Sequence, residues 1–565
     1  MNKLEVKDKL KDNKLPEGWV KVKLGSLLIE SKERNITNKK LLVFSITNKK
    51  VFVLQDEYFS HNIHSKKTTN YKVFRENYFG YNPARINVGS IALSEKQREG
   101  LLSPMYVIFK TKSTLNPKYL KYFLQTSHFK NNVINNVAGS VRECLNYSFL
   151  EMFDFIYPIL ITEQNKIAEI LEIVEETIEK NDAIIEKYKR IKQGLMQDLL
   201  TRGITAFEFE KDKLIAAVKK VFKNGDHRFG REENLVSHLS RHLNEFFPGW
   251  DVDSEVEKNN ERQRSDIIIH KRRMDENLFA IEIKKNDNLN AIKQDIEKLE
   301  DVMLEDYHYE DAIFVGFDIE NFEDVFKLSE KVNFILVSKN GEIKVKSRIR
   351  SFKDSSLGRI PEEWKVVELG EVGKIITGST PSTERTEYYG EDYPFISPED
   401  INYEKYVNKS VKMLSKLGFK ISRKIPPKSI CVVCIGSTIG KVSLTIEETT
   451  TNQQINTIVS NRKMYDPDGL YYFTLFYIQK PLRIEAGLQA VPIVNKSKFA
   501  KIKIPIPPLP EQHYIASILS QIDETIEKEQ KYREKLERIK QGLMEDLLAG
   551  EIRTNHLIKE GVESV

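Results

Sequence analysis

Two long segments, residues 161–204 and 509–552, carry apolar residues at alternating intervals of four and three positions. The apolar positions are Ile167, Leu171, Val174, Ile178, Ile185, Tyr188, Leu195 and Leu199 in the first segment, and Ile515, Leu519, Ile522, Ile526, Leu536, Leu543 and Leu547 in the second. This spacing is typical of the a/d seam of a coiled coil. Polar residues interrupt the seam at Asn181, Lys192, Glu529, Arg533 and Lys540. Buried polar residues at such positions usually specify the register of the pairing, so the pattern predicts two long helices that pair with each other.

The two segments are copies of one another. They align at a constant offset of 348 residues without a gap, and 24 of the 44 aligned positions are identical. An earlier pair, LPEGWVKVKLG (15–25) and IPEEWKVVELG (360–370), matches at an offset of 345. Each half therefore runs from a Pro-Glu-x-x-Trp opening through a globular segment to a long helix, which indicates a duplicated structural unit. A pseudo-two-fold protein of this kind suits duplex DNA. The alternative is a simple dimerisation coil, which leaves the matching globular openings unexplained.

Composition narrows the class of protein. The chain has 565 residues, a formal net charge of +5 and three cysteines. The weakly basic balance is compatible with nucleic-acid binding, and so few cysteines exclude a disulfide framework. No apolar run of 18 residues occurs, so we expect a soluble cytoplasmic protein that does not interact with membranes.

The globular segments carry a specific set of motifs. ITGSTPSTERTEYYGEDYPFISPEDI (376–401), CIGSTIGKVSLT (434–445) and TNQQINTIV (451–459) precede a PLPEQ lead-in and the second RIKQGLM helix. In combination they resemble the specificity subunits of type I restriction-modification systems, over about 419 residues. The resemblance implies two target recognition domains, each reading half of an asymmetric bipartite sequence in double-stranded DNA. It also implies that the paired helices dock DNA methyltransferase (modification) subunits, with two expected, and that a restriction or translocase subunit can join.

The second half does not begin directly after the first helix, because about 146 residues intervene. This insert shows a helix at 231–247, a Pro248-Gly249 turn and three strands at 250–256, 266–270 and 278–284. A helix at about 289–304 and strands at 312–316 and 334–337 follow. Alternation of short apolar strands with helices indicates a separate α/β domain.

Three residues of the insert are candidates for catalysis. Asp266 opens one strand, and Glu282 and Lys284 share a face of the next strand because side chains alternate. Two carboxylates suit Mg²⁺, which polarises a phosphodiester and lowers the pKa of a bound water, and the lysine can stabilise developing charge. We therefore take Asp266 and Glu282 as metal ligands and all three as catalytic.

This arrangement resembles the PD-(D/E)xK nuclease superfamily, over about residues 225–340, with Ser265 in place of the leading proline. The resemblance implies a further acidic residue on the first helix. Glu232 and Glu233 both qualify; the sequence does not decide between them, and Glu233 is taken as the candidate. Gln294 is a possible supporting group, and Lys298 stands where one nuclease variant has a tyrosine. A short Glu-x-Lys pattern on a strand also arises often by chance, where charged residues alternate on a solvent-exposed face.

Other candidate motifs fail their chemical requirements. Asn82-Pro83-Ala84-Arg85 lacks the second proline and the aromatic residue of a methyltransferase motif. Gly436–Val442 is one residue short of a phosphate loop, and Val442 replaces the Ser or Thr that would hold Mg²⁺. The Cys431-x-x-Cys434 pair lies in an apolar run and is interpreted as a buried strand.

The sequence thus predicts an α/β multidomain fold. Two α/β target recognition domains (1–160 and 351–508) are separated by an antiparallel two-helix coiled coil (161–204 and 509–552), with an inserted α/β nuclease-like domain (205–350) and a tail (553–565). The expected function is recognition of a bipartite DNA target within a type I complex, and the insert adds Mg²⁺-dependent cleavage if it is active. The alternatives are a stand-alone sequence-specific endonuclease and a specificity subunit whose insert has lost catalysis. The target sequence and the base-contacting residues stay open.

Overall fold

The computed structural model describes residues 15–47, 51–58, 68–95, 99–137, 144–223, 232–257, 264–271, 276–285, 288–306, 309–402, 404–407, 409–487 and 492–558. The start of the predicted first domain and the end of the predicted tail lie outside these residues. The chain forms two compact units, Met1–Lys187 with Glu527–Val565, and Tyr188–Ile526. Among the described helices, none is both long and apolar enough to cross a bilayer.

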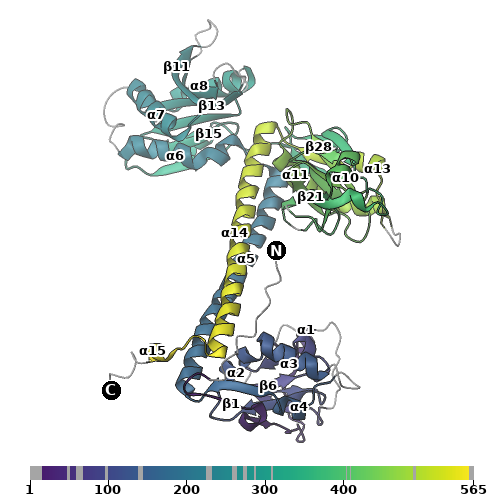
Figure 1. The fold of residues 1–565 in the computed structure, drawn as a ribbon. Helices are drawn as coiled ribbons and strands as arrows, with labels where there is room; N and C mark the ends of the chain where they lie inside the picture. The colour runs from purple at the N-terminus through teal and green to yellow at the C-terminus, as the bar shows by residue number, and fades with distance from the viewer. Residues whose placement is uncertain are drawn as a thin grey trace. The chain divides into compact units, whose positions relative to one another are not determined.

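The first unit contains an α/β lobe built from short, apolar, largely β-branched or aromatic strands (Figure 1). One four-stranded sheet has the order β2 (Leu28–Glu30), β9 (Val107–Thr111), β6 (Tyr78–Tyr81), β7 (Ile91–Leu93). The other has the order β4 (Phe52–Leu54), β3 (Val43–Ile46), β8 (Glu99–Leu102), β5 (Lys72–Arg75). The helices of the lobe are α1 (Gln55–Tyr58), α2 (Pro117–Phe123), α3 (Ser127–Val137) and α4 (Tyr147–Glu151), with 3-10 turns at Leu24–Leu27 and Ile86–Val88.

The second unit contains a corresponding lobe. Its five-stranded sheet has the order β20 (Gly373–Thr377), β28 (Ile455–Ser460), β25 (Ile430–Val433), β26 (Val442–Thr445), β22 (Tyr406–Val407). A four-stranded sheet has the order β23 (Lys412–Leu414), β21 (Tyr389–Ile396), β27 (Thr449–Thr451), β24 (Lys424–Ile425). The helices are α10 (Lys416–Ile421), α11 (Pro467–Tyr477), α12 (Gln479–Ala486) and α13 (Lys496–Ala500), with a 3-10 turn at Thr386–Tyr388. The Cys431 and Cys434 run is buried along β25, as its apolar sequence predicts.

The duplication predicted from the sequence is visible in equivalent strand pairs. β1 (Trp19–Lys23) pairs antiparallel with β10 (Asp154–Pro158), and β19 (Lys365–Glu368) pairs antiparallel with β29 (Lys503–Ile506). Each pair joins the opening of one half to the residues that lead into its long helix. The repeated sequence therefore encodes the same local structure twice.

A repeated clasp holds each long helix to its lobe. In the second unit Glu511, 7% exposed, accepts a hydrogen bond from Trp364 Nε1 at 3.0 Å and two from Arg350, at 2.6 and 2.7 Å. In the first unit Glu163, 1% exposed, has the same role: it accepts from Trp19 Nε1 at 3.4 Å and twice from Arg553, at 2.9 and 3.2 Å. We call these sets of three the Trp–Glu–Arg clasps. Bidentate Arg–carboxylate pairs fix geometry as well as charge, which explains why the glutamate of the PLPEQ lead-in is repeated.

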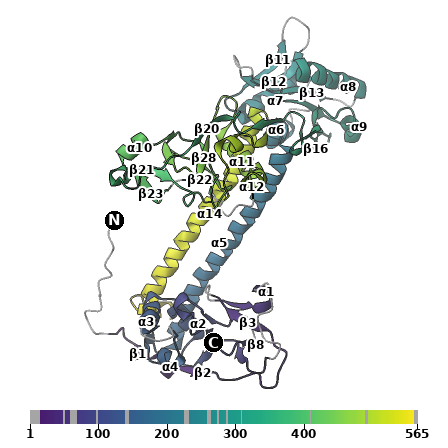
Figure 2. The same ribbon diagram turned by 90° about the vertical axis from the view of Figure 1, so that its right-hand side faces the viewer.

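The long helices are α5 (Ile161–Arg202) and α14 (Leu509–Ala549), and their pairing is antiparallel (Figures 1 and 2). In the first unit Glu175 contacts Lys540 at 2.7 Å, while Asn181, further along α5, donates to Glu529, which is earlier in α14, at 2.5 Å. In the second unit Lys192 contacts Asp523 at 2.6 Å. The polar residues that interrupt the predicted seam therefore pair across it, which specifies the register.

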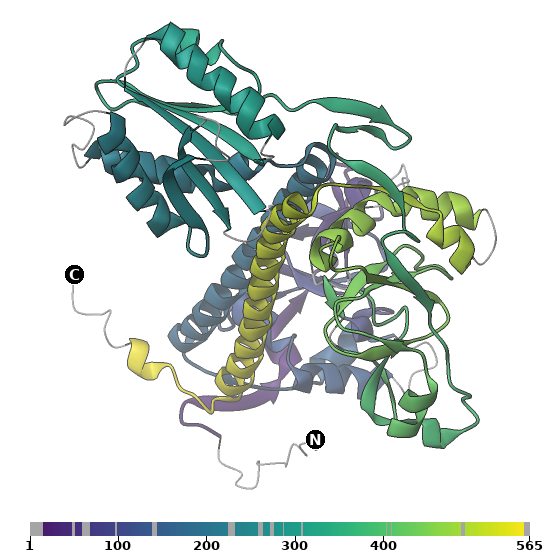
Figure 3. The same cartoon turned by 90° about the horizontal axis from the view of Figure 1, so that it is seen from above.

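The insert forms a mixed six-stranded sheet with helices on both faces (Figure 3). The strand order is β11 (Asp251–Glu257), β12 (Arg264–Lys271), β13 (Glu276–Lys285), β14 (Asp311–Phe317), β15 (Asn333–Val337), β16 (Ile343–Lys346), with β13, β14 and β15 parallel. The helices are α6 (Ala206–Lys223), α7 (Glu232–Phe246), α8 (Leu289–Lys298), the π-helical η4 (Leu299–Asp306) and α9 (Phe322–Phe326). The hairpin β17 (Phe352–Ser355) and β18 (Gly358–Pro361) follows the insert, and α15 (Asn555–Ile558) follows α14.

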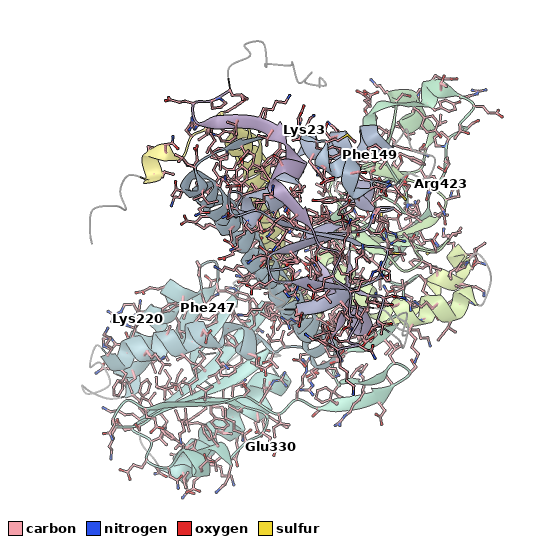
Figure 4. All side chains as sticks on the ribbon, turned by 90° about the horizontal axis from the view of Figure 1, so that it is seen from below. Lys23, Phe149, Lys220, Phe247, Glu330 and Arg423 are labelled. Atoms are coloured by element: carbon pink, nitrogen blue, oxygen red, sulfur yellow. The ribbon has the colours of Figure 1, made fainter. Side chains whose placement is uncertain are left out.

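Two separate apolar cores cover the faces of the insert sheet. One contains α6, α7 and Phe247, labelled in Figure 4, together with Ile267, Ile281 and Ile283 of the strands. The other contains α8 and the alternate strand residues Ile268 and Ala280. Side-chain alternation around Ile268 and Ala280 thus assigns Asp266, Glu282 and Lys284 to the α8 face of the sheet. The α6 helix and β16 were not predicted from the sequence.

Both ends of the insert meet at the second clasp. The Ile204 N–H donates to Glu511 Oε1 at 2.8 Å, and Arg350 Nη1 donates to the Arg202 carbonyl at 3.0 Å. Gly203, with φ +72°, follows α5 just as Gly550, with φ +75°, follows α14. Insertions are tolerated where the two flanking residues lie close together, so the clasp explains how the repeat accommodates about 146 residues at this point.

Candidate functional site

The three predicted catalytic residues of the insert lie on one face of its sheet. Asp266 is on β12, and Glu282 and Lys284 are on the adjacent strand β13. Because side chains alternate along a strand, all three lie on the same face of the sheet as Ile268 and Ala280, which pack toward α8. The structure therefore brings together the two carboxylates and the lysine that the sequence singled out.

Burial dominates the electrostatics of the carboxylates. Glu282 is 3% exposed, and burial together with the neighbouring charge of Asp266 raises its pKa to about 8. Burial also raises the pKa of Asp266, although its Oδ2 accepts a hydrogen bond from the Ile283 N–H at 2.6 Å. Two carboxyl groups that share a buried position disfavour double ionisation, and such pairs occur often at functional sites.

Two lysines lie on this face of the sheet. Lys298 Nζ of α8 lies 2.8 Å from Glu282 Oε1. Lys284 Nζ lies 3.2 Å from Asp295 of α8 and 3.5 Å from Glu232. Burial alone would lower the pKa of Lys284, but these two carboxylates raise it, so the lysine is held as a cation at the sheet surface.

Of the two first-helix glutamates, Glu232 is the one that contacts the strand carrying Lys284, whereas the candidate Glu233 does not reach it in the described residues. Glu232 begins α7, contacts Lys284, and accepts a hydrogen bond from the Lys285 N–H at 3.3 Å. Glu233 is exposed. Side chains of successive residues in an α-helix point in directions that differ by about 100°. Only the packing of α7 on the sheet decides which of two adjacent glutamates reaches the strand.

The contribution of α8 was only partly anticipated. Gln294, named as a possible supporting group, is exposed, whereas Asp295 and Lys298 face the carboxylates. These two residues are three positions apart, beside the buried Ile292 and Ile296. A helical projection of residues 289–304 onto the predicted sheet would have identified them.

The donor set fits a magnesium ion that retains most of its water. Among the described residues, no group of three or more His, Cys, Asp or Glu side chains gathers as metal ligands. Mg²⁺, however, is commonly held by one or two carboxylates and several waters. The buried Glu282 Oε1 contacts the Lys298 ammonium at 2.8 Å, so an ion bound there would take the place of this ammonium.

Sequence comparisons identify what the two halves are similar to. The family model described as the type I restriction modification DNA specificity domain matches residues 16–190 and 361–538, together more than half of the chain. The chain is 32% identical over 191 residues to the type I restriction enzyme MjaIX specificity subunit of Methanocaldococcus jannaschii, 33% of this chain and 44% of that protein. It is 34% identical over 203 residues to the HindI specificity subunit of Haemophilus influenzae, 34% of this chain and 42% of that protein. The matched part thus spans about half the length of each of these relatives.

Solved structures that align with this chain include the S subunit of a type I system from M. genitalium. That structure aligns over 95% of this chain and 97% of its own length, with 12% identity and a TM-score of 0.43. The HsdS subunit from Thermoanaerobacter tengcongensis aligns over 95% of this chain and 98% of its own length, with 14% identity and a TM-score of 0.34.

The matched ranges contain the two Trp-bearing openings, the two lobes and most of both long helices, and they omit residues 191–360, which include the insert. The chain therefore belongs to the family of type I restriction modification DNA specificity domains, with one such domain in each half.

Proposed function

We propose that this chain is the sequence-recognition subunit of a type I restriction-modification complex, and that each lobe reads one half of a split target in double-stranded DNA. The observation that carries the proposal is the family match to both halves of a duplicated chain. The two lobes share their strand-pair openings and their clasps but differ in the sequences of their surface loops. Two lobes that share a duplicated structure but differ in their loop sequences favour an asymmetric bipartite target.

The proposal is tested by selecting duplexes from a random pool with the intact chain and its methyltransferase partner. We expect the recovered sequences to share two short conserved blocks separated by a spacer of constant length. Specific protein–DNA complexes exceed non-specific binding by roughly 10³ or more, so the recovered duplex is compared with a scrambled one at moderate salt. A chain that binds both equally well would not be a recognition subunit.

The helices also support docking of methyltransferase subunits. Ile191 of α5 and Ile539 of α14 occupy the same position of the repeated RIKQGLM motif, and their side chains are 38% and 42% exposed. A repeated apolar residue that stays exposed in both copies favours two equivalent contacts with two copies of one partner.

We further propose that the insert is a Mg²⁺-dependent nuclease domain. Asp266 and Glu282 would hold the ion, with Lys284 beside them and Glu232 positioning that lysine. The bound ion would polarise a phosphodiester and favour ionisation of a bound water. Lys284, kept cationic by Asp295 and Glu232, would stabilise negative charge that develops on the phosphate.

One observation favours the rival, an insert without catalysis. The ammonium group of Lys298 lies 2.8 Å from Glu282 and supplies an internal positive charge to the carboxylate pair. In a domain retained only for structure or DNA contact, this lysine would compensate Glu282 permanently.

Cleavage of unmethylated plasmid in the presence of Mg²⁺ distinguishes a nuclease insert from an insert without catalysis. The intact chain with its methyltransferase partner is compared with Lys284→Ala and with the control Lys285→Ala, which changes the adjacent lysine on the opposite face of β13. We expect the wild type and the control to cut, and Lys284→Ala to bind the plasmid without cutting it. Binding without cutting by all three proteins would support the non-catalytic insert.

A further inference from the structure

The second lobe contains a basic hollow at the edge of its five-stranded sheet. The hollow has a volume of about 570 Å³ and is lined by Lys374 of β20, Arg423, Lys424 of β24, and Lys496 of α13. The remaining lining residues are Ile375, Ile376 and Thr377. Among the residues that the structure describes, no acidic side chain lines the hollow, and basic residues reach it from three separate segments of the chain.

The positive charges of the hollow are not neutralised. Lys374, Arg423, Lys424 and Lys496 are exposed, and none forms an ion pair with a carboxylate in the described part of the chain. Arg423, labelled in Figure 4, donates from Nη1 to the Thr377 carbonyl at 2.8 Å, and the Lys424 ammonium lies 5.0 Å from the Phe419 ring centroid. These two cations are therefore oriented by neutral partners that leave their charge available.

Two lysines elsewhere in the same lobe are compensated by a carboxylate. Lys405 and Lys428 both contact the carboxylate of Asp468, at 2.6 and 2.9 Å. The hollow is thus a local concentration of uncompensated positive charge, and such a surface attracts the closely spaced phosphates of a nucleic-acid backbone.

Two polar loops adjoin the hollow. The loop 378–382 follows Thr377, and its Ser379 N–H donates at 2.9 Å to the carbonyl of Thr451, the last residue of β27, which precedes the loop 452–454. The Arg423 N–H donates to Ser379 Oγ at 3.3 Å, which connects these loops to the basic lining. Thr380 donates its hydroxyl to Gln453 Oε1, so the exposed Gln453 amide is held while its N–H groups have no described partner.

We propose that this hollow holds the phosphate backbone of duplex DNA and that Gln453, beside it, reads a base edge of the half-target assigned to the second lobe. The inference rests on the proposed recognition function and specifies its contact surface. Phosphate contacts fix the register of a protein on DNA, and an amide side chain can read a base, adenine above all, through paired hydrogen bonds. Lys374, Lys424 and Lys496 supply the first kind of contact and Gln453 the second.

The phosphate contacts are tested on a single duplex of arbitrary sequence with the full-length chain. Affinity is measured against salt concentration for the wild type and for the triple variant Lys374→Ala, Lys424→Ala and Lys496→Ala. Each lost contact lowers the slope of log affinity against log salt by about 0.9, so we expect a decrease of roughly 2–3. Replacement of chloride by inorganic phosphate at equal ionic strength should not displace the duplex, and displacement would indicate a site for free phosphate instead.

Lys409→Ala is the matched control for charge. Lys409 is an exposed lysine that follows β22, at the opposite edge of the same sheet, and it lines a different hollow. We expect its salt dependence to equal that of the wild type. A triple variant that binds with the wild-type slope would overturn the assignment of the hollow.

The base contact is tested separately with Gln453→Ala. We expect its preference for the selected target over a scrambled duplex to fall on the order of ten-fold, with an unchanged salt slope. An unchanged preference would overturn the role of Gln453. If the wild type itself shows no sequence preference, the recognition function fails rather than this assignment of its surface.

Discussion

Gly203 follows the last residue of α5 in the left-handed region, with φ +72°. A Cβ atom built there would lie 1.9 Å from Glu511 Oε1 and 2.3 Å from Arg350 Nη1. Any side chain at this position would therefore disrupt the second Trp–Glu–Arg clasp as well as strain the backbone.

We expect Gly203→Ala to destabilise the second unit by at least ~2 kcal/mol, because a non-glycine residue in this region costs about 1–2 kcal/mol before the clasp is displaced. Gly194→Ala is the control, since a methyl group on that glycine, inside α5, would meet no atom beyond the helix's own backbone within 4 Å. It should stabilise the helix by roughly 0.5–1 kcal/mol. Denaturant unfolding of both variants measures the difference in their free energies of unfolding. Equal changes in the two variants would contradict a stabilising role of the clasp.

The proposed Mg²⁺ site predicts an affinity that depends on pH, because it contains the buried Glu282. Its pKa of about 8 means that the folded protein holds this carboxyl protonated at lower pH, whereas the ion binds the carboxylate. Proton release must accompany binding, so the affinity should rise with pH up to about 8 and then level off. Titration calorimetry between about pH 6 and pH 9 measures this profile without any requirement for cleavage.

Two variants check the assignment. Glu282→Gln should abolish the binding heat, and Lys298→Met, which removes the competing ammonium, should tighten binding by roughly ten-fold. A binding profile in Glu282→Gln that equals the wild type would place the ion elsewhere.

At the scale of elements, Glu175 connects three helices of the first unit. Its carboxylate on α5 contacts Lys121 of α2 at 2.7 Å and Lys540 of α14 at 2.7 Å. Burial alone would raise its pKa, but the two lysines lower it to about 2. The ionised form is therefore bound more favourably in the folded chain than in the unfolded chain, whose glutamates titrate near 4.5.

The sign of the linkage follows from this depressed pKa. The stabilisation is present above about pH 4.5 and is lost as the pH falls toward about 2, because the unfolded chain takes up the proton first. We expect Glu175→Gln to lower the local stability of α2 by roughly 2–3 kcal/mol at neutral pH and much less near pH 2. Hydrogen exchange of the α2 amides measures this, and the exposed neighbour Glu176→Gln should have little effect.

At the scale of the whole molecule, the duplicated chain predicts two equivalent partner sites. Ile191→Asp and Ile539→Asp each place a charge on one copy of the repeated exposed position. We expect each single variant to bind one methyltransferase subunit instead of two, and the double variant to bind none. The mass of the assembled complex, measured by light scattering or native mass spectrometry, gives the stoichiometry.

Ile173→Asp provides the control for this experiment. Ile173 is 57% exposed on α5, but the equivalent residue of α14 is Gln521, so the apolar side chain is not repeated. This variant should keep two subunits. Equal loss of bound methyltransferase subunits in the three single variants would indicate a general effect on the helices rather than two defined sites.

The sequence by itself determined the features that depend on local periodicity. The duplication follows from alignment of the chain with itself at an offset of 348 residues. The two long helices and the strands that carry Asp266, Glu282 and Lys284 follow from spacings of three, four or two residues, which a short window of the chain contains. The polar seam residues were also identifiable, because each interrupts a regular apolar pattern.

Contacts between residues far apart in the sequence depend on how the elements pack together. Arg350 reaches Glu511 across 161 positions and Arg553 reaches Glu163 across 390, and neither arginine differs from a surface arginine in its local sequence. The choice of Glu232 over Glu233, and the approach of Lys298 to Glu282, depend on how α7 and α8 are rotated against the sheet. That rotation is set by the buried faces of the packed helices, an energy summed over many contacts that no single motif encodes.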